Sequence, residues 1–300
     1  MGGFRLGTFT PSVLLEVARR DGRLARAGLE VTEVAVTSSP QQFASLAAGE
    51  YEAVFTSPDN VLAYHFLSHN PLGQRRALEV VAALDGGLGL ALALAPGASD
   101  VTALAHGPLG VDVATSGFAF VAYALLERRG QAPGDYEVVA LGSTPARAAA
   151  LLAGGCAATI VNAGNDQRVA SAGATLVATV AELGPYLGGV LAAEAGGRRD
   201  ARAARERLAD ALVATAAEVR AGARERDVVE VAEDLLGLSA AEAHAHYRVL
   251  CDPRHGYVPD GRVDPAALHT LIDLRRRYLP DPELAGLEER VGEVVLARAQ

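Results

Sequence analysis

The chain has no lysine and no tryptophan among its 300 residues, and only two cysteines. Without lysine, a Schiff-base enzyme and a Walker-type phosphate loop are both excluded, because each needs that side chain. Cys156 and Cys251 have no metal-type spacing, so neither a disulfide framework nor a zinc knuckle is predicted. A formal charge of -9, from 36 acidic and 27 basic residues, leaves no cationic excess and argues against a nucleic-acid partner.

What is present indicates an ordered globular protein, since 50% of the residues are hydrophobic and 21% are charged. The length suffices for one two-lobed domain or two ordinary ones. Residues 1–5 lead into patterned sequence without a secretory signal, so we expect a cytoplasmic location, or a periplasmic or extracellular one if an export signal was removed. The charge-free run at 148–165 is broken by glycines and asparagine, so no membrane span is predicted.

An internal repeat organises the chain. With a constant offset, Ser39-Pro40 corresponds to Thr144-Pro145, and Ser57 corresponds to Asn162. Both copies show the order strand, helix, strand, helix, strand. Strands alternating with helices favour a parallel sheet, so we predict an α/β protein with two similar lobes.

The predicted lobes have definite boundaries. Residues 1–95 form the first part of lobe I, 96–186 form lobe II, and 187–300 return to lobe I and end in C-terminal helices wrapped around it. Extended segments at 78–95 and 184–193 join the lobes, which predicts a hinge with a ligand cleft between them.

Hydroxyl residues follow several predicted strands. Thr10-Pro11, Ser39-Pro40 and Ser57-Pro58 are typical helix starts, and Ser39 with Gln42 matches a capping box. Because parallel strands end at one edge of a sheet, these side chains are expected to face the cleft. Capping alone is the alternative role for each.

The cleft is expected to bind a small polar ligand without a metal or cofactor. Loops around Thr10, Ser39 and Ser57 contain no arginine, which disfavours a nucleotide and favours a zwitterion or heterocycle. His65 and His69 share a helix face but lack a third ligand in phase, so no metal site is predicted. The predicted ligand-binding residues are Phe9, Thr10, Ser39, Ser57, Asn60, Asp85, Thr115, Ser116, Asn162, Asp166 and Tyr186.

Several segments also resemble a known family. They include residues 14–22, 28–31, 49–53 and 56–60, together with Asp85-Gly86-Gly87-Leu88-Gly89, Gly184-Pro185-Tyr186-Leu187-Gly188-Gly189 and Asp252-Pro253-Arg254-His255-Gly256-Tyr257. Their order is similar to that in nitrate-, sulfonate- and taurine-type solute-binding proteins of ABC transporters, a superfamily that also contains thiamine-pyrimidine synthases. The resemblance implies a type II periplasmic-binding-protein fold and, if the protein is exported, an ABC permease as partner.

The sequence therefore favours binding of a small ligand between the lobes, such as a zwitterion, a sulfonate or carboxylate, or a pyrimidine-like ring. The alternative is a cytoplasmic biosynthetic enzyme on the same scaffold, a lyase, isomerase or synthase, in which Asp59, Asp85, His65 or Tyr186 supplies acid and base groups. A ligand-sensing subunit is a third possibility. Fold alone does not separate these functions.

Overall fold

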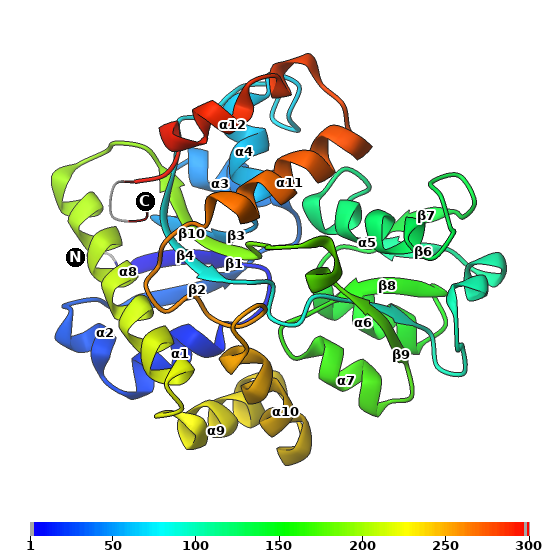
Figure 1. Ribbon diagram of the computed structural model, residues 1–300. Coiled ribbons are helices and arrows are strands. Elements are labelled where there is room, and N and C mark those ends of the chain that lie inside the picture. The colour runs from blue at the N-terminus through cyan, green and yellow to red at the C-terminus, as the bar shows by residue number, and fades with distance from the viewer. Residues whose placement is uncertain (1–2, 297–298, 300) are drawn as a thin grey trace.

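The computed structural model describes residues 3–296 and 299 and contains two five-stranded sheets side by side (Figure 1). The first sheet, with its flanking helices, is lobe I. Its strands, in spatial order, are β2 (Val31–Ala35), β1 (Phe4–Thr8), β3 (Ala53–Thr56), β10 (Gly189–Glu194) and β4 (Leu78–Asp85). The second sheet, with its helices, is lobe II. Its strands are β7 (Val138–Ala140), β6 (Leu109–Val111), β8 (Ala158–Val161), β5 (Ala91–Leu94) and β9 (Thr175–Thr179).

The repeat is visible in the topology, because corresponding strands occupy corresponding places in the two sheets. Strand β1 pairs in parallel with β2 and β3, and β6 pairs in parallel with β7 and β8, as predicted. The expectation of wholly parallel sheets is wrong for β10 and β5, which pair antiparallel with both neighbours. These two strands enter from the opposite lobe and therefore run in the opposite direction.

The chain crosses between the lobes twice, at residues 86–90 and at residues 184–188. Strand β4 lies in lobe I, whereas β5 pairs with β8 and β9 of lobe II, although the predicted grouping placed residues up to 95 with lobe I. Both strands are buried along their whole length, so their sequences carry no alternation that would show which sheet they join.

Short helices connect the strands within each lobe. In lobe I these are α1 (Val13–Arg20), α2 (Arg23–Arg26), α3 (Ser39–Ala47) and α4 (Pro58–Phe66). In lobe II they are the 3-10 helix η1 (Val101–His106), α5 (Gly117–Glu127), α6 (Thr144–Leu152), α7 (Asn165–Ser171) and the 3-10 helix η2 (Val180–Leu183). Helix α1 shows the logic: its apolar residues fall on one face and are buried, and Ser12 accepts a hydrogen bond from the Leu15 N–H at the N-terminus.

The C-terminal third is helical, as predicted. It contains α8 (Arg199–Arg220), α9 (Glu225–Leu236), α10 (Ala240–Cys251), α11 (Pro265–Tyr278), the 3-10 helix η3 (Pro282–Leu284), α12 (Leu287–Arg290) and the 3-10 helix η4 (Val291–Glu293). The sequence pattern also predicts a helix at 287–298. The α-helix there ends at Arg290, and residues 297–298 lie outside the described residues.

These helices do not cover lobe I alone. Helix α8 packs on β4 and α1, but α10 packs on α7 and α11 packs on α5, both of lobe II. Tyr278 of α11 stacks on Phe120 with ring centroids 6.1 Å apart, and its hydroxyl donates to Glu127 at 2.7 Å. The C-terminal helices therefore hold the two lobes against each other.

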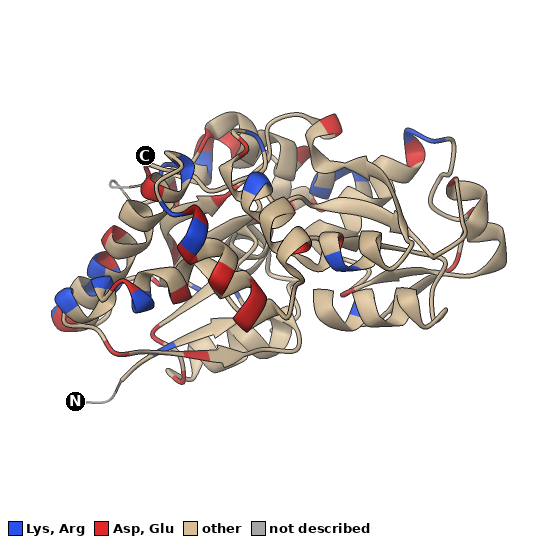
Figure 2. Cartoon of the chain, turned by 90° about the horizontal axis from the view of Figure 1, so that it is seen from below, with Lys and Arg blue, Asp and Glu red and all other residues tan. Residues whose placement is uncertain are grey.

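Charged side chains are distributed unevenly, with many on the outer helices of lobe I and fewer on lobe II (Figure 2). Among the described residues, no helix is both long enough and apolar enough to cross a bilayer.

Candidate functional site

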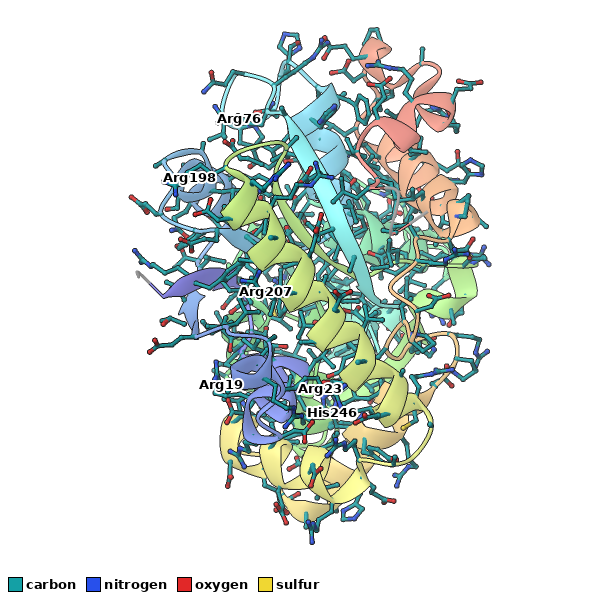
Figure 3. All side chains as sticks on the ribbon, turned by 90° about the vertical axis from the view of Figure 1, so that its left-hand side faces the viewer. Arg19, Arg23, Arg76, Arg198, Arg207 and His246 are labelled. Carbon is teal, nitrogen blue, oxygen red and sulfur yellow. The ribbon has the colours of Figure 1, made fainter. Side chains whose placement is uncertain are left out.

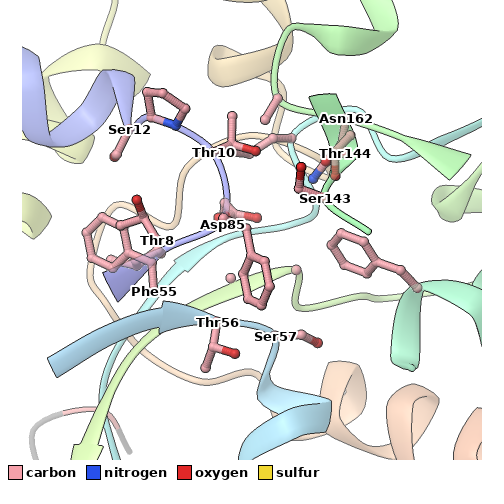
Figure 4. Close-up of a pocket in the computed structure, with 18 of the residues that line it drawn as sticks. Thr8, Thr10, Ser12, Phe55, Thr56, Ser57, Asp85, Ser143, Thr144 and Asn162 are labelled. Atoms are coloured by element: carbon pink, nitrogen blue, oxygen red, sulfur yellow. The ribbon is translucent and has the colours of Figure 1, made fainter. Parts of the chain in front are cut away.

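A cavity of about 170 Å³ lies between the lobes, where the strand ends of the two sheets face each other (Figure 4). Lobe I contributes the segments after β1 and β3 and the end of β4, and lobe II contributes the segments after β6, β7 and β8. This arrangement is the one expected for open α/β sheets, which bind ligands beyond the carboxyl ends of their strands. We call this cavity the cleft.

The structure brings most of the predicted ligand-binding residues to the cleft. Those that line it are Phe9, Thr10, Ser57, Asn60, Asp85, Ser116 and Asn162. The repeat accounts for the pairing of Ser57 with Asn162, which follow the equivalent strands β3 and β8. Asn162 also donates to the Gly87 carbonyl at 3.0 Å and so fixes the crossover next to the cleft.

The helix starts differ by one or two residues from the predicted ones. Helix α1 is capped by Ser12, so the Thr10 hydroxyl is not used for capping and lies in the cleft (Figure 4). Helix α3 is capped by Ser38, and Ser39 is its first residue. The predicted capping box is therefore wrong: the Gln42 side chain instead donates to the Gly7 and Phe55 carbonyls, which ties α3 to two strand ends. Ser57 caps α4 as predicted.

Four predicted ligand-binding residues do not line the cleft. Ser39 lies against Tyr64, and Thr115 is exposed one residue before the cap of α5. The Asp166 carboxylate accepts from the Gly164 N–H at 3.0 Å and from Gln167, which turns it toward its own helix start, and burial raises its pKa to about 6. Tyr186 belongs to the second crossover, and its side chain is buried in the core.

Three of the four proposed acid and base groups lie away from the cleft. Asp59 forms a buried ion pair with Arg275, with two hydrogen bonds of 2.6 Å. His65 accepts from the Leu78 N–H at 3.1 Å, and burial lowers its pKa. Tyr186 is the third, so Asp85 alone of this set reaches the cleft.

Asp85 stands at the end of β4, where the chain leaves lobe I. Burial raises its pKa to about 7, against the opposing effect of the Gly87 and Gly189 N–H groups that donate to it. Its carboxylate fits only because its neighbours are glycines: a Cβ on Gly189 would lie 2.3 Å from Oδ2, and one on Gly188 would lie 2.6 Å from Oδ1. The carboxylate is thus enclosed between the two crossovers, and with a pKa of about 7 it changes its protonation state near neutral pH.

Two charged residues that were not predicted, Asp112 and Arg147, also line the cleft. Arg147 is the basic one. It lies on α6, is 1% exposed, and donates to the carbonyls of Gly142 and Ile160 and to Thr144 Oγ1. Among the described residues no carboxylate lies within 4 Å of its guanidinium. Burial lowers its pKa, and the charge of Asp112, which also lines the cleft, opposes this shift. The internal repeat could have pointed to Arg147, because α6 corresponds to α3 and Arg147 occupies the position that Gln42 occupies in lobe I.

Aromatic rings and hydroxyls complete the wall. Phe9, Phe55 and Phe118 line the cleft, and Phe118 follows the α5 cap Ser116, whose hydroxyl donates to Asp112. Further lining residues that were not predicted as ligand-binding include Asp112, Thr8, Ser12, Thr56, Ser143, Thr144, Leu236, His246 and Tyr257. The last three come from the C-terminal part of the chain, whose sequence carries no repeat to link it to the cleft.

No protein-family model matches the sequence, and no curated protein matches it at the sequence level. Solved structures do match. The nitrate-binding protein NrtA from Synechocystis PCC 6803 has a TM-score of 0.80 at 12% identity, covering 98% of this chain and 86% of that one. The alkanesulfonate-binding protein SsuA from Xanthomonas axonopodis pv. citri, bound to MOPS, has a TM-score of 0.72 at 17% identity, covering 99% and 98%. The desulfurization enzyme DSZB has a TM-score of 0.59 at 18% identity, covering 92% and 91%. The chain therefore has the two-lobed fold of the periplasmic solute-binding proteins, as its sequence predicted.

Proposed function

We propose that the protein binds a small molecule with an anionic head group, a sulfonate or a carboxylate, in the cleft between its lobes. The observation that carries this proposal is Arg147, a buried cation on the cleft wall that has no carboxylate within 4 Å among the described residues. Asp112 also lines the cleft and its charge acts on Arg147, but it forms no ion pair with the guanidinium. A buried charge without a counter-ion in contact is costly, and an anionic ligand would supply that contact.

Helix geometry supports the same chemistry. Helices α1, α4, α5 and α6 begin at residues that line the cleft, so the positive ends of their dipoles point toward it. Free hydroxyls such as that of Thr10 can donate to sulfonate or carboxylate oxygens. The rings of Phe9 and Phe118 offer apolar faces for the body of the ligand.

The arrangement favours binding over catalysis. Of the acid and base groups considered for an enzyme, only Asp85 lines the cleft, and neither cysteine does. A general base must reach the proton that it removes, and the Asp85 carboxylate is instead engaged by the Gly87 and Gly189 N–H groups. If the protein is exported and acts in transport, an ABC permease would be the partner that receives the ligand. A bridging ligand would favour the closed arrangement of the lobes.

The proposal is tested by calorimetry with benzenesulfonate and its neutral analogue methyl phenyl sulfone. We expect the wild type to bind the sulfonate, and to bind it more tightly than the sulfone. Replacing Arg147 by Met should weaken sulfonate binding roughly 30-fold or more, the effect of losing one partner of a buried charge pair. Sulfone binding should change little.

Arg128→Met is the matched control, because Arg128 is an exposed arginine of the same lobe and its loss changes the net charge equally. It should bind both compounds as the wild type does. Equal affinity of the wild type for sulfonate and sulfone, or sulfonate binding that survives in Arg147→Met, would show that the cleft does not select an anionic head.

A further inference from the structure

Three leucines and a histidine line the cleft near α9 and α10. Leu14, Leu88 and Leu236 belong to one apolar cluster, and His246 of α10 lies next to Leu236, since a Cβ on Gly164 would lie within 4 Å of both side chains. Figure 3 places His246 at the end of the molecule where α9 and α10 lie. We call these four residues the His246 compartment. It is separate from the contacts of Arg147, which are made to β8 and to α6 and the segment before it.

His246 is buried without a hydrogen-bond partner for its Nδ1 atom, although the ring faces the cleft. Burial lowers its pKa to about 4, so the ring is neutral at neutral pH and has one donor and one acceptor nitrogen. Buried polar atoms are almost always paired, and an unpaired one calls for an explanation. A ligand group entering from the cleft would supply the pair.

One residue of the compartment, Leu88, and the neighbouring cleft residue Ala163 have an unusual backbone conformation. Leu88 and Ala163 are the described non-glycine residues with positive φ, at 51° and 54°, and both line the cleft. The Ala163 N–H donates to the Leu88 carbonyl at 3.0 Å. This pairing joins the first crossover to the segment after β8 and keeps Leu88 in the compartment. Strained residues persist where the surroundings fix them, often at ligand sites.

We propose that the His246 compartment receives an apolar ring of the ligand that carries a second polar group, a hydroxyl or an amide, hydrogen-bonded to the His246 ring. This inference rests on the proposed function, since the acid group of the same molecule lies at Arg147. The ligand class is therefore an aromatic or cyclic sulfonate or carboxylate with a hydroxyl or amide substituent, rather than a simple alkyl acid or an inorganic anion.

Two neutral fragments of similar shape, phenol and toluene, test the compartment without involving an acid group. In NMR titrations of protein labelled with ¹⁵N in histidine, we expect phenol to bind at least 10-fold more tightly than toluene and to shift the ring nitrogens of His246. His246→Leu should abolish the preference for phenol. His244→Leu, an equal change at an exposed histidine of the same helix, should preserve it.

Equal binding of phenol and toluene to the wild type, absence of phenol binding, or a phenol preference that survives in His246→Leu would overturn the proposal. Stability separates a ligand contact from a packing role. Because leucine removes an unpaired buried nitrogen, His246→Leu should melt at or above the wild-type temperature. A lower melting temperature with unchanged phenol binding would assign His246 to packing and also overturn the proposal.

The same titrations on Arg147→Met keep the two proposals apart. The phenol preference should remain in that variant while benzenesulfonate binding falls. If benzenesulfonate binding is independent of Arg147 while the phenol preference still depends on His246, the proposal of an anionic head group at Arg147 is wrong and the proposal for the His246 compartment is supported. If Arg147 governs sulfonate binding but His246 has no effect on phenol binding, the proposal for the compartment is wrong and the proposal of an anionic head group stands.

Discussion

The Asp59–Arg275 ion pair predicts that Asp59 contributes to the stability of the fold and not to ligand binding. Asp59 lies in the first turn of α4 in lobe I, and Arg275 on α11 donates two hydrogen bonds of 2.6 Å to its carboxylate. The Arg275 guanidinium also lies over the Phe120 ring of lobe II, 5.2 Å from its centroid. The pair therefore fixes α11 at the contact between the lobes, and Asp59→Asn removes one of its charges.

The expected magnitude follows from burial. The side chains of Arg275 and Asp59 are 5% and 1% exposed, so solvent cannot replace either partner. Removing one member of such a pair leaves the other charge buried and unpaired, which typically costs about 3–5 kcal/mol. Replacing both partners, in Asp59→Asn with Arg275→Met, removes that stranded charge and should recover part of the loss.

Urea denaturation of the single and double variants measures these free energies of unfolding. Calorimetry at a temperature where Asp59→Asn is folded should give nearly wild-type affinity for benzenesulfonate, because the Asp59 carboxylate points to α11 and not into the cleft. A variant of wild-type stability that no longer binds benzenesulfonate would refute this reasoning and return Asp59 to the binding site.

Three further predictions concern the crossovers and the contact between the two lobes. Because the pKa of Asp85 is raised to about 7 from 3.8, the protonated side chain stabilises the fold below pH 4. This contribution, about 4 kcal/mol at most, is lost as the pH rises through 7. Denaturation between pH 4 and 8 should therefore show a steeper fall in the wild type than in Asp85→Asn, and equal slopes would contradict the assigned pKa. Gly117→Ala would place a Cβ 2.8 Å from Asp59 Cβ, so the lobes should separate; an unchanged radius of gyration in solution scattering would speak against this contact. Gly188→Ala would place a Cβ 2.3 Å from Gly87 Cα, so it should destabilise the crossover by about 1–3 kcal/mol in thermal denaturation, and a wild-type melting temperature would show that the crossover can adjust.

Much of the architecture was predictable because it depends on local signals repeated along the chain. The correspondence of Ser39-Pro40 with Thr144-Pro145 located α3 and α6, and the offset placed β3 and β8 correctly. The capping residue of α3 was not predictable, because Ser38 precedes Ser39 and either hydroxyl can cap a helix that begins next to Pro40. Adjacent hydroxyl residues leave such a boundary undecided until the backbone is known.

The charged and C-terminal parts of the cleft were less predictable. Arg147 lies inside a helix rather than in a loop, and only the fold turns it toward the strand ends. His246 comes from α10, far along the chain from Ala163, the last lining residue of lobe II, so its place depends on the packing of α10 against α7. In the sequence alone, Asp59 and Asp85 are equally good candidates for an acid or base group of the cleft. Its partner Arg275 is remote along the chain, and no local pattern reveals such a pair.

Equilibrium dialysis of wild-type protein and Arg147→Met against a mixed extract of small metabolites, followed by mass spectrometry, tests the central claim most directly. We expect the wild type to enrich sulfonates or carboxylates that carry a ring, and we expect these compounds to be recovered chemically unchanged. Arg147→Met should not enrich them. Enrichment of the same compounds by both proteins, or of compounds without an acid group, would contradict it.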